Sequence, residues 1–227
     1  MKNILIVVLL FSGILTSQAQ QTEVREVGSF SGVKSGEAID VYLKKGDKES
    51  VKVEVTSAKL SDVITEISGS YLKVHMRSGV YRNRGTIKVY VTYVNLNKIS
   101  ASSASNVFSE GTIKTSLMDI SVSSAAQIEL KIESENLTID VSSAGDIVLE
   151  GKAKSFEVEA SSAGDVDAYN LESERVEARA SSGGSVKINV TKELDAQASS
   201  GGSIRYRGNP MKTNSDSSSG GSVKKSN

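Results

Sequence analysis

From residue 98 onward, apolar and polar residues alternate in short runs that recur about every 19 positions. Residues 128–132 read Ile-Glu-Leu-Lys-Ile, and residues 186–190 read Val-Lys-Ile-Asn-Val. A period of two is typical of a β-strand with one buried face. No repeat contains the 3.6-residue period of an amphipathic helix, so the pattern predicts an all-β fold.

A motif of two serines followed by two small residues precedes each of these runs and occurs seven times. Its first serine lies at the following positions: Ser102, Ser123, Ser142, Ser161, Ser181, Ser199 and Ser218. Successive steps therefore range from 18 residues (181 to 199) to 21 residues (102 to 123). Repeats of this length predict a parallel β-helix-like solenoid of about seven 18–21-residue coils over residues 98–227.

The motif itself has a structural interpretation as the corner of each coil. The Ala and Gly residues suit a chain that turns with positive φ or packs without a side chain. We expect the serines to form stacked hydroxyl ladders at the bend. A further apolar column is expected along the coils at Leu117, Leu137, Phe156, Val176 and Leu194.

The inward-facing residues become smaller along the chain, from Ile and Val to Ser215 and Ser217. The last coil is therefore expected to bury the least apolar area. Residues 209–210 (Asn-Pro) and 224–225 (Lys-Lys) are the expected blockers of the open strand edge at that end.

The N-terminal portion, residues 21–97, is β-rich but less regular. Strands are expected at 38–43, 51–55, 71–76 and 86–94, with a boundary near residue 97 and continuity with the solenoid. Residues 1–20 have the features of a signal peptide: Lys2, an apolar stretch over 4–15, and small or polar residues before position 21. We therefore expect an exported protein with no membrane span in the mature chain.

Charge and composition exclude several classes of function. Lys and Arg total 27 and Asp and Glu total 27, so a nucleic-acid partner, which needs a positive surplus, is not expected. The chain has no cysteine, which excludes disulfides and thiolate metal sites. No motif for a cofactor is present, and none is expected.

Several segments together resemble a known family. They are residues 30–33 (Phe-Ser-Gly-Val), residues 39–43 (Ile-Asp-Val-Tyr-Leu), and the repeated Ser-Ser-Ala-Gly-Asp and Ser-Ser-Gly-Gly-Ser segments. With the export signal, they resemble the putative autotransporter adhesin, head GIN domain family. The resemblance implies a right-handed parallel β-helix-like fold in an exported bacterial protein, without catalytic residues.

Acidic residues in one motif column are the first candidate site. Asp146 and Asp165 occupy the same position in adjacent coils, and Asp167 lies two residues further on. Stacked carboxylates could share a proton, hold calcium or act on a polysaccharide. The rest of the column consists of Asn, Gln and Ser, which favours a plain turn position.

A second binding candidate is Tyr81, Arg82 and Arg84, because exposed tyrosine and arginine are typical interface anchors. The alternative is a hairpin loop with solvated arginines. His75, the one histidine, has no cysteine or second histidine beside it, so we expect a structural or surface role rather than catalysis or metal binding.

These observations favour a non-catalytic, adhesin-like interaction module located in the periplasm, at the cell surface or outside the cell. Its expected partner is a protein, a glycan or another copy of the chain, which would make it a homo-oligomer. The alternatives are a polysaccharide-active enzyme on a β-helix and a purely structural envelope protein.

Overall fold

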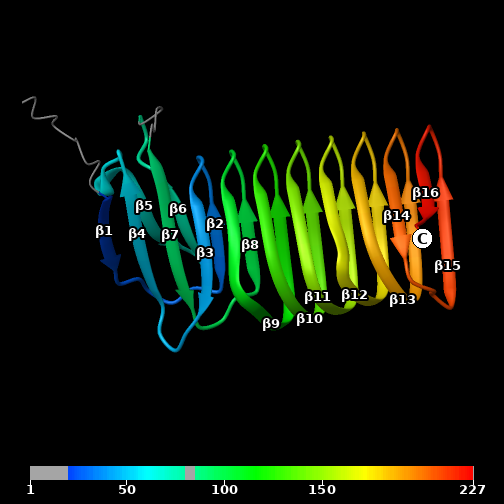
Figure 1. The fold of residues 1–227 in the computed structure, drawn as a ribbon, viewed down its shortest axis with the longest axis horizontal. Helices are drawn as coiled ribbons and strands as arrows, with labels where there is room; N and C mark the ends of the chain where they lie inside the picture. The colour runs from blue at the N-terminus through cyan, green and yellow to red at the C-terminus, as the bar shows by residue number, and fades with distance from the viewer. Residues whose placement is uncertain (1–19, 80–84, 227) are drawn as a thin grey trace, which may run out of the picture.

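The structure is a computed structural model that describes residues 20–79 and 85–226. Within these ranges the chain is almost entirely β, with one short 3-10 turn, η1 (Leu60–Asp62). The described residues form sixteen strands of one sheet, which is wound into a β-solenoid of about seven turns (Figure 1). The all-β solenoid predicted from the repeat is confirmed.

Five long strands of 14 to 17 residues make the regular part of the solenoid. They are β9 (Asn106–Val122), β10 (Gln127–Val141), β11 (Asp146–Ala160), β12 (Asp165–Ala180) and β13 (Ser185–Ala198). Each pairs in parallel with the next, from its first residue to its last, as in Gln127↔Asp146 and Val141↔Ala160. Each of these five coils thus contains one long bent strand rather than two or three short ones, because pairing continues through the bend, whereas the next coil is divided into β14 (Ser203–Arg207) and β15 (Lys212–Ser217).

The wound sheet forms two opposite walls of the solenoid, which we call the front face and the back face. The corners and the bends of the long strands connect them. The front face, which Figure 1 views, contains β1 (Gln20–Arg25), β4 (Ser50–Thr56), β7 (Thr86–Tyr93), β3 (Asp40–Lys45), the first parts of β9–β13, β14 (Ser203–Arg207) and β16 (Ser222–Lys225). The back face contains β5 (Val63–Ser68), β6 (Tyr71–Met76), β2 (Gly32–Ser35), β8 (Lys98–Ala101), the last parts of β9–β13, and β15 (Lys212–Ser217).

Each corner is a tight turn with two residues in the left-handed region. At the first corner these are Ser103 (φ 54°) and Ala104 (φ 59°), and the Ser105 amide donates to the Ser102 carbonyl at 3.2 Å. The Ala104 amide donates to the Ser124 carbonyl of the next corner at 3.0 Å. The ladder that connects the corners is therefore made of backbone groups, and the expectation of a hydroxyl ladder was wrong.

In the last five motifs the second small residue is a glycine with little or no room for a side chain, in line with the sequence prediction for the corners. A Cβ on Gly184 would lie 2.4 Å from the Ala160 carbonyl oxygen of the preceding coil. Gly183, directly before it, has nothing within 4 Å of its Cβ position but lies at φ +76°. The two adjacent glycines thus have different roles: Gly184 is required for packing, and Gly183 eases a positive φ that Ala144 and Ala163 also adopt at this position.

The core lies between the two faces and consists of stacked apolar columns. The central front column is Val107, Ile128, Ile147, Val166, Val186 and Ile204. The back column opposite is Ile99, Ile120, Ile139, Val158, Ala178 and Ala196. At the C-terminal end every residue of β15 is exposed, in line with the small residues expected there.

In the apolar column predicted from Leu117 to Leu194, the assignment of Leu117 was wrong. Leu117 is 48% exposed, and Met118, which pairs with Leu137, takes its place in the core. Strand β9 carries two extra residues relative to β10, since Phe108 pairs with Glu129 and Thr112 with Lys131. Counting back 19 residues from Leu137 gives Met118, so the pairing register decides which residue faces inward.

An eighth corner, at residues 36–39 (Gly-Glu-Ala-Ile), lies in the N-terminal portion. Glu37 and Ala38 have positive φ, and the Ala38 amide donates to the Ser103 carbonyl at 3.0 Å. This corner joins β2 to β3, which pair with β8 and β9. The strand expected at 38–43 therefore starts at Asp40, while those expected at 51–55, 71–76 and 86–94 coincide with β4, β6 and β7.

Both ends of the solenoid have features that limit edge pairing. At the N-terminal end the antiparallel pairs β1–β4, β4–β7 and β5–β6 cover the first parallel layer and leave β1 and β5 as the edge strands. At the C-terminal end the Lys225 ammonium donates to the Asn209 side-chain carbonyl at 2.7 Å, which joins the two expected edge blockers. Within the described ranges no helix is long and apolar enough to cross a membrane.

The paired glycines of the fifth corner yield a stability prediction. Gly184→Ala should lower the free energy of unfolding by about 3 kcal/mol, because its Cβ would overlap backbone that cannot move cheaply. Gly183→Ala, with free space but a positive φ, should cost only about 1 kcal/mol. Urea unfolding of both variants measures the difference, and equal costs would contradict the proposed packing of the corner.

Candidate functional site

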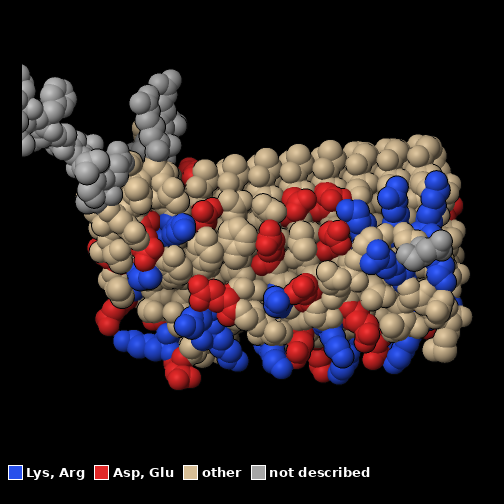
Figure 2. Space-filling model, in the orientation of Figure 1, with Lys and Arg blue, Asp and Glu red and all other residues tan. Residues whose placement is uncertain are grey.

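One set of outward residues on the front face forms a continuous column along the solenoid, which we call the front column. Strand pairing places its members side by side in the following order: Lys52, Tyr90, Tyr42, Phe108, Glu129, Val148, Asp167, Lys187, Arg205 and Lys224. The column is aromatic near the N-terminal end, acidic in the middle and basic at the C-terminal end. Figure 2 shows acidic side chains gathered at mid-face and basic ones toward the C-terminal end.

Asp167, in the middle of the front column, lies beside Asp146 and Asp165, so the three aspartates predicted from the sequence form one cluster. Asp146 and Asp165 are register partners on β11 and β12, and Asp167 lies beside them on the same face. Lys187 of β13, which the sequence did not single out, reaches two of them: its Nζ lies 3.6 Å from Asp165 Oδ2 and 3.5 Å from Asp167 Oδ2. The cluster therefore contains its own cation.

Electrostatics distinguish the members of this cluster. Burial raises the pKa of Asp146, the Asp165 carboxylate raises it further, and Lys187 opposes both effects. Burial alone would lower the pKa of Lys187, but Asp165 and Asp167 outweigh it and the net shift is upward. A firmly protonated lysine at this point competes with any bound cation. Among the described residues, no group of three or more His, Cys, Asp or Glu side chains is arranged to hold a metal ion.

The second predicted site, Tyr81, Arg82 and Arg84, lies outside the described residues. Its role in binding stays a prediction.

An aromatic stack next to the acidic cluster was not predicted from the sequence. The ring centroids of Tyr42 and Tyr90 are 5.1 Å apart and those of Tyr42 and Phe108 are 5.3 Å apart, close to one strand spacing. Lys52 Nζ lies 4.1 Å from the Tyr90 ring centroid and ends the stack on one side. Positions 42, 90 and 108 are distant in sequence, and only the strand order β7-β3-β9 makes them neighbours.

A hollow of about 350 Å³ opens on the front face where the aromatic stack ends. We call it the Phe108 hollow, and its walls are Phe108, Ser109, Glu129, Leu130, Lys131, Val148, Glu150 and Asn170. The strand register shifts on both sides of it, between β9 and β10 and between β11 and β12. Extra residues in β9 and β12 thus bulge beside the regular pair β10–β11.

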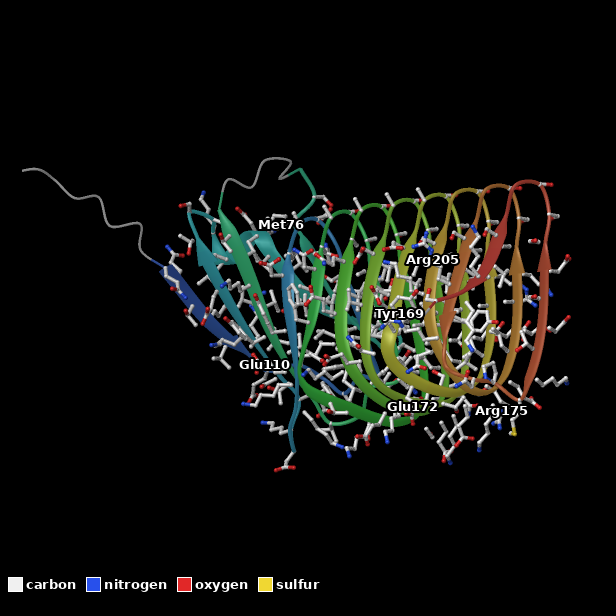
Figure 3. All side chains as sticks on the ribbon, turned by 45° about the vertical axis from the view of Figure 1, so that its right-hand side comes forward. Met76, Glu110, Tyr169, Glu172, Arg175 and Arg205 are labelled. Carbon is white, nitrogen blue, oxygen red and sulfur yellow. The ribbon has the colours of Figure 1, made fainter. Side chains whose placement is uncertain are left out.

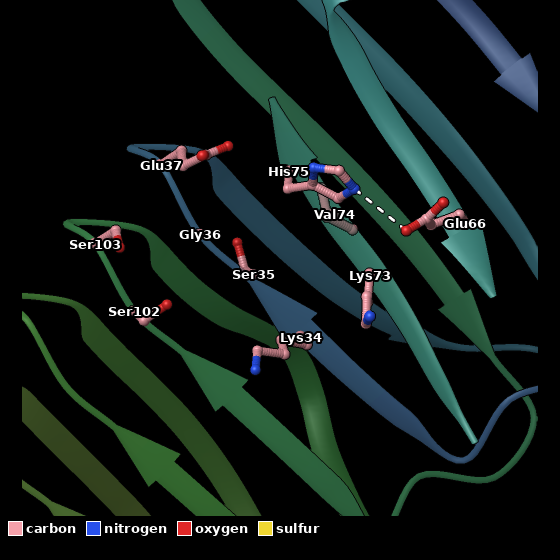
Figure 4. A pocket seen from close by; sticks show the side chains of 10 residues that line it. All are labelled: Lys34, Ser35, Gly36, Glu37, Glu66, Lys73, Val74, His75, Ser102 and Ser103. Carbon is pink, nitrogen blue, oxygen red and sulfur yellow. Dashed lines mark ion pairs between the residues drawn. The ribbon is translucent and has the colours of Figure 1, made fainter. Parts of the chain in front are cut away.

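A second hollow, of about 370 Å³, lies on the back face near the corners of β2, β6 and β8 (Figure 4). Lys34, Lys73 and His75 contribute nitrogen groups to it, and Glu37 and Glu66 contribute carboxylates. The His75 Nε2 atom lies 3.5 Å from Glu66 Oε1, and Nδ1 lies 2.9 Å from the Met76 carbonyl. His75 therefore sits at the surface between two partners.

The bend opposite the corners carries charged side chains such as Glu172 and Arg175 (Figure 3). Ion pairs connect neighbouring coils here, including Lys114–Glu133 at 2.8 Å, Lys154–Glu135 at 2.7 Å and Lys192–Glu174 at 2.8 Å. Exposed pairs of this kind contribute little stability each. Their regular spacing shows that the bend is a charged, solvated edge between the two faces.

The comparison with protein families decides the classification of this fold. A family model described as putative auto-transporter adhesin, head GIN domain, matches residues 29–210. The chain belongs to this head GIN domain family. The match covers the N-terminal layers and most of the coils, and it confirms the resemblance recognised from the motifs. Among curated proteins, none matches the chain.

Solved structures similar to this head GIN domain protein share its fold over almost their whole length. A putative adhesin from Bacteroides fragilis is 20% identical with a TM-score of 0.83, and the alignment covers 92% of this chain and 98% of that one. A putative adhesin from Parabacteroides merdae is 19% identical with a TM-score of 0.76, covering 92% and 96%. A putative lipid binding protein from Parabacteroides distasonis is 18% identical with a TM-score of 0.68, covering 92% and 97%. At these identities the likeness establishes the fold alone.

The acidic cluster yields a prediction on pH. Because the pKa of Asp146 is raised in the folded state, its contribution to stability is present at low pH and is lost as the pH rises through the folded pKa. Lys187→Met removes the cation and should raise the pKa of Asp146 further. Carbon-13 NMR titration of the Asp146 carboxyl measures this directly.

The matched control is Lys192→Met, whose cation pairs with Glu174 in a different cluster at the bend. This substitution should leave the Asp146 titration unchanged. A fall in the pKa of Asp146 in Lys187→Met would contradict the assigned role of Lys187.

Proposed function

We infer that this head GIN domain protein is an exported, non-catalytic, adhesin-like module that binds its partner through the front face. The observation that carries this proposal is the front column. Its aromatic, acidic and basic segments are stacked at strand spacing on one flat face, which suits an extended surface contact. The family, described as putative adhesins, supports the same class of function.

The acidic cluster favours binding over hydrolysis. A glycosidase needs one protonated carboxyl and one carboxylate on either side of the scissile bond. The raised pKa of Asp146 resembles the first of these, but Lys187 occupies the space between Asp165 and Asp167 and pairs with both. We therefore assign the cluster to recognition and ion pairing, and not to acid–base chemistry.

Export follows from the same proposal. Residues 1–20 have the features of a signal peptide, and a surface-binding module has to leave the cytoplasm to reach its partner. The partner itself is a protein, a glycan or a second copy of the chain, and the front face is the surface that would meet any of them.

A blocking experiment tests the assignment of the face. The chain has no cysteine, so Glu129→Cys on the front column and Glu157→Cys on the back face can each be coupled to one bulky polyethylene glycol chain. Both residues are exposed glutamates, which matches the two variants in charge and setting. Fluorescent beads coated with the full chain are then scored for retention on mucin-coated glass and on epithelial cell layers.

The front-face conjugate should lose retention by about tenfold, equal to about 1.4 kcal/mol, while the back-face conjugate should match the unmodified protein. Equal retention of both conjugates, or loss only in the back-face conjugate, would contradict the proposal. Neither the wild type nor Asp146→Ala/Asp165→Ala should release reducing ends from polysaccharides. Release that disappears in the double variant would establish the enzyme alternative instead.

A further inference from the structure

We propose that the Phe108 hollow is a binding site for the sugar rings of a neutral glycan. This inference rests on the proposed function, because it names the ligand of the same front face. The hollow has about 350 Å³, near the lower end of the range for small-molecule sites. It is thus large enough for a sugar unit while the surrounding face remains flat.

Apolar groups provide the wall against which a sugar ring can pack. Phe108 ends the aromatic stack, Val148 lies two strands further along the front column on the other side of Glu129, and Leu130 is only 3% exposed at the base of the hollow. A sugar ring presents C–H groups on its faces, and burying such groups against aromatic and aliphatic side chains is favourable. The apolar wall is small, which fits one ring better than an extended apolar ligand.

Polar groups of both kinds surround this wall. Glu129 and Glu150 offer acceptors, the Lys131 ammonium is a donor, and the Asn170 amide offers both. Lys131 Nζ pairs with Glu150 at 2.9 Å, which holds both side chains at the rim. Each sugar hydroxyl can both donate and accept hydrogen bonds, so a sugar can satisfy a mixed set of this kind.

Charge excludes other ligand classes. The rim carries two carboxylates and one ammonium, and the Asp146–Asp165–Asp167 cluster lies further along the same face. A phosphate or uronate would be repelled by this negative surplus. A purely apolar ligand would strip water from Glu129 and Asn170 without replacing their hydrogen bonds, which is costly. A neutral ligand rich in hydroxyls avoids both penalties.

The aromatic stack extends the site beyond a single ring. Phe108 belongs both to the hollow and to the stack with Tyr42 and Tyr90. All three side chains are half-buried, so their outer edges remain available for contact. A glycan chain that lies along the solenoid axis can therefore contact the hollow and the stack together, and binding should strengthen with chain length.

Native affinity gels test the assignment with defined probes. The full chain is run in gels that contain dextran, galactomannan, laminarin or, as an anionic comparison, polygalacturonate. Phe108→Ala removes the aromatic wall of the hollow, and Asn170→Ala removes one exposed polar group. Tyr71→Ala, an outward-facing aromatic on the back face, is the matched control. Thermal melts verify that every variant is folded.

We expect at least one of the neutral polysaccharides to retard the wild-type protein in the gel. If laminarin is that polysaccharide, its oligomers should bind more tightly as their chain length increases. Phe108→Ala and Asn170→Ala should each weaken retention by about tenfold, and Tyr71→Ala should not. Retention that both hollow variants preserve would overturn this site. Binding of polygalacturonate alone, or bead adhesion without any neutral-glycan retention, would overturn the neutral-glycan assignment but leave the adhesin-like function standing. If the wild-type protein neither retains beads on the coated surfaces nor is retarded by any polysaccharide, both the adhesin-like function and the glycan site are overturned.

Discussion

The structure depends on one constraint, the in-register pairing of parallel strands between successive coils. This pairing puts equivalent residues about one strand spacing apart and sends alternate residues to opposite sides of the sheet. An inward position repeated in every coil becomes a continuous core column, as from Val107 to Ile204. An outward position becomes a continuous line of surface chemistry, so the front column inherits its order directly from the hydrogen-bond register.

The repeat was sufficient to predict the parts of the fold that depend on local pattern. The corners, the buried alternation and the polar C-terminal end all follow from spacing and residue size. The β2–β3 corner was missed because Gly36 and Glu37 replace the paired serines, although the backbone turn is the same. The insertion of β2–β3 between β6–β7 and β8–β9 depends on long-range pairing, which no local pattern encodes.

The candidate site also contains some residues that the local pattern could predict and others that depend on long-range pairing. Asp146 and Asp165 could be predicted because they share a motif position, while Lys187 required knowledge that it follows Asp167 in the outward column. The aromatic stack joins residues from three strands that are far apart in the chain. One signal for the Phe108 hollow was present in the sequence: the 21- and 20-residue steps after Ser102 and Ser161 are the repeats that bulge in β9 and β12.

The surface of the solenoid combines a regular, rigid scaffold with one irregular feature, the Phe108 hollow. Coils of constant length give flat, repetitive faces, and the two longer coils open a hollow between them beside Phe108. A crystal structure of the full chain with a bound neutral oligosaccharide tests this account most directly. It should show a sugar ring in the Phe108 hollow, against Phe108 and Val148. A sugar bound only in the back-face hollow near His75 would contradict it.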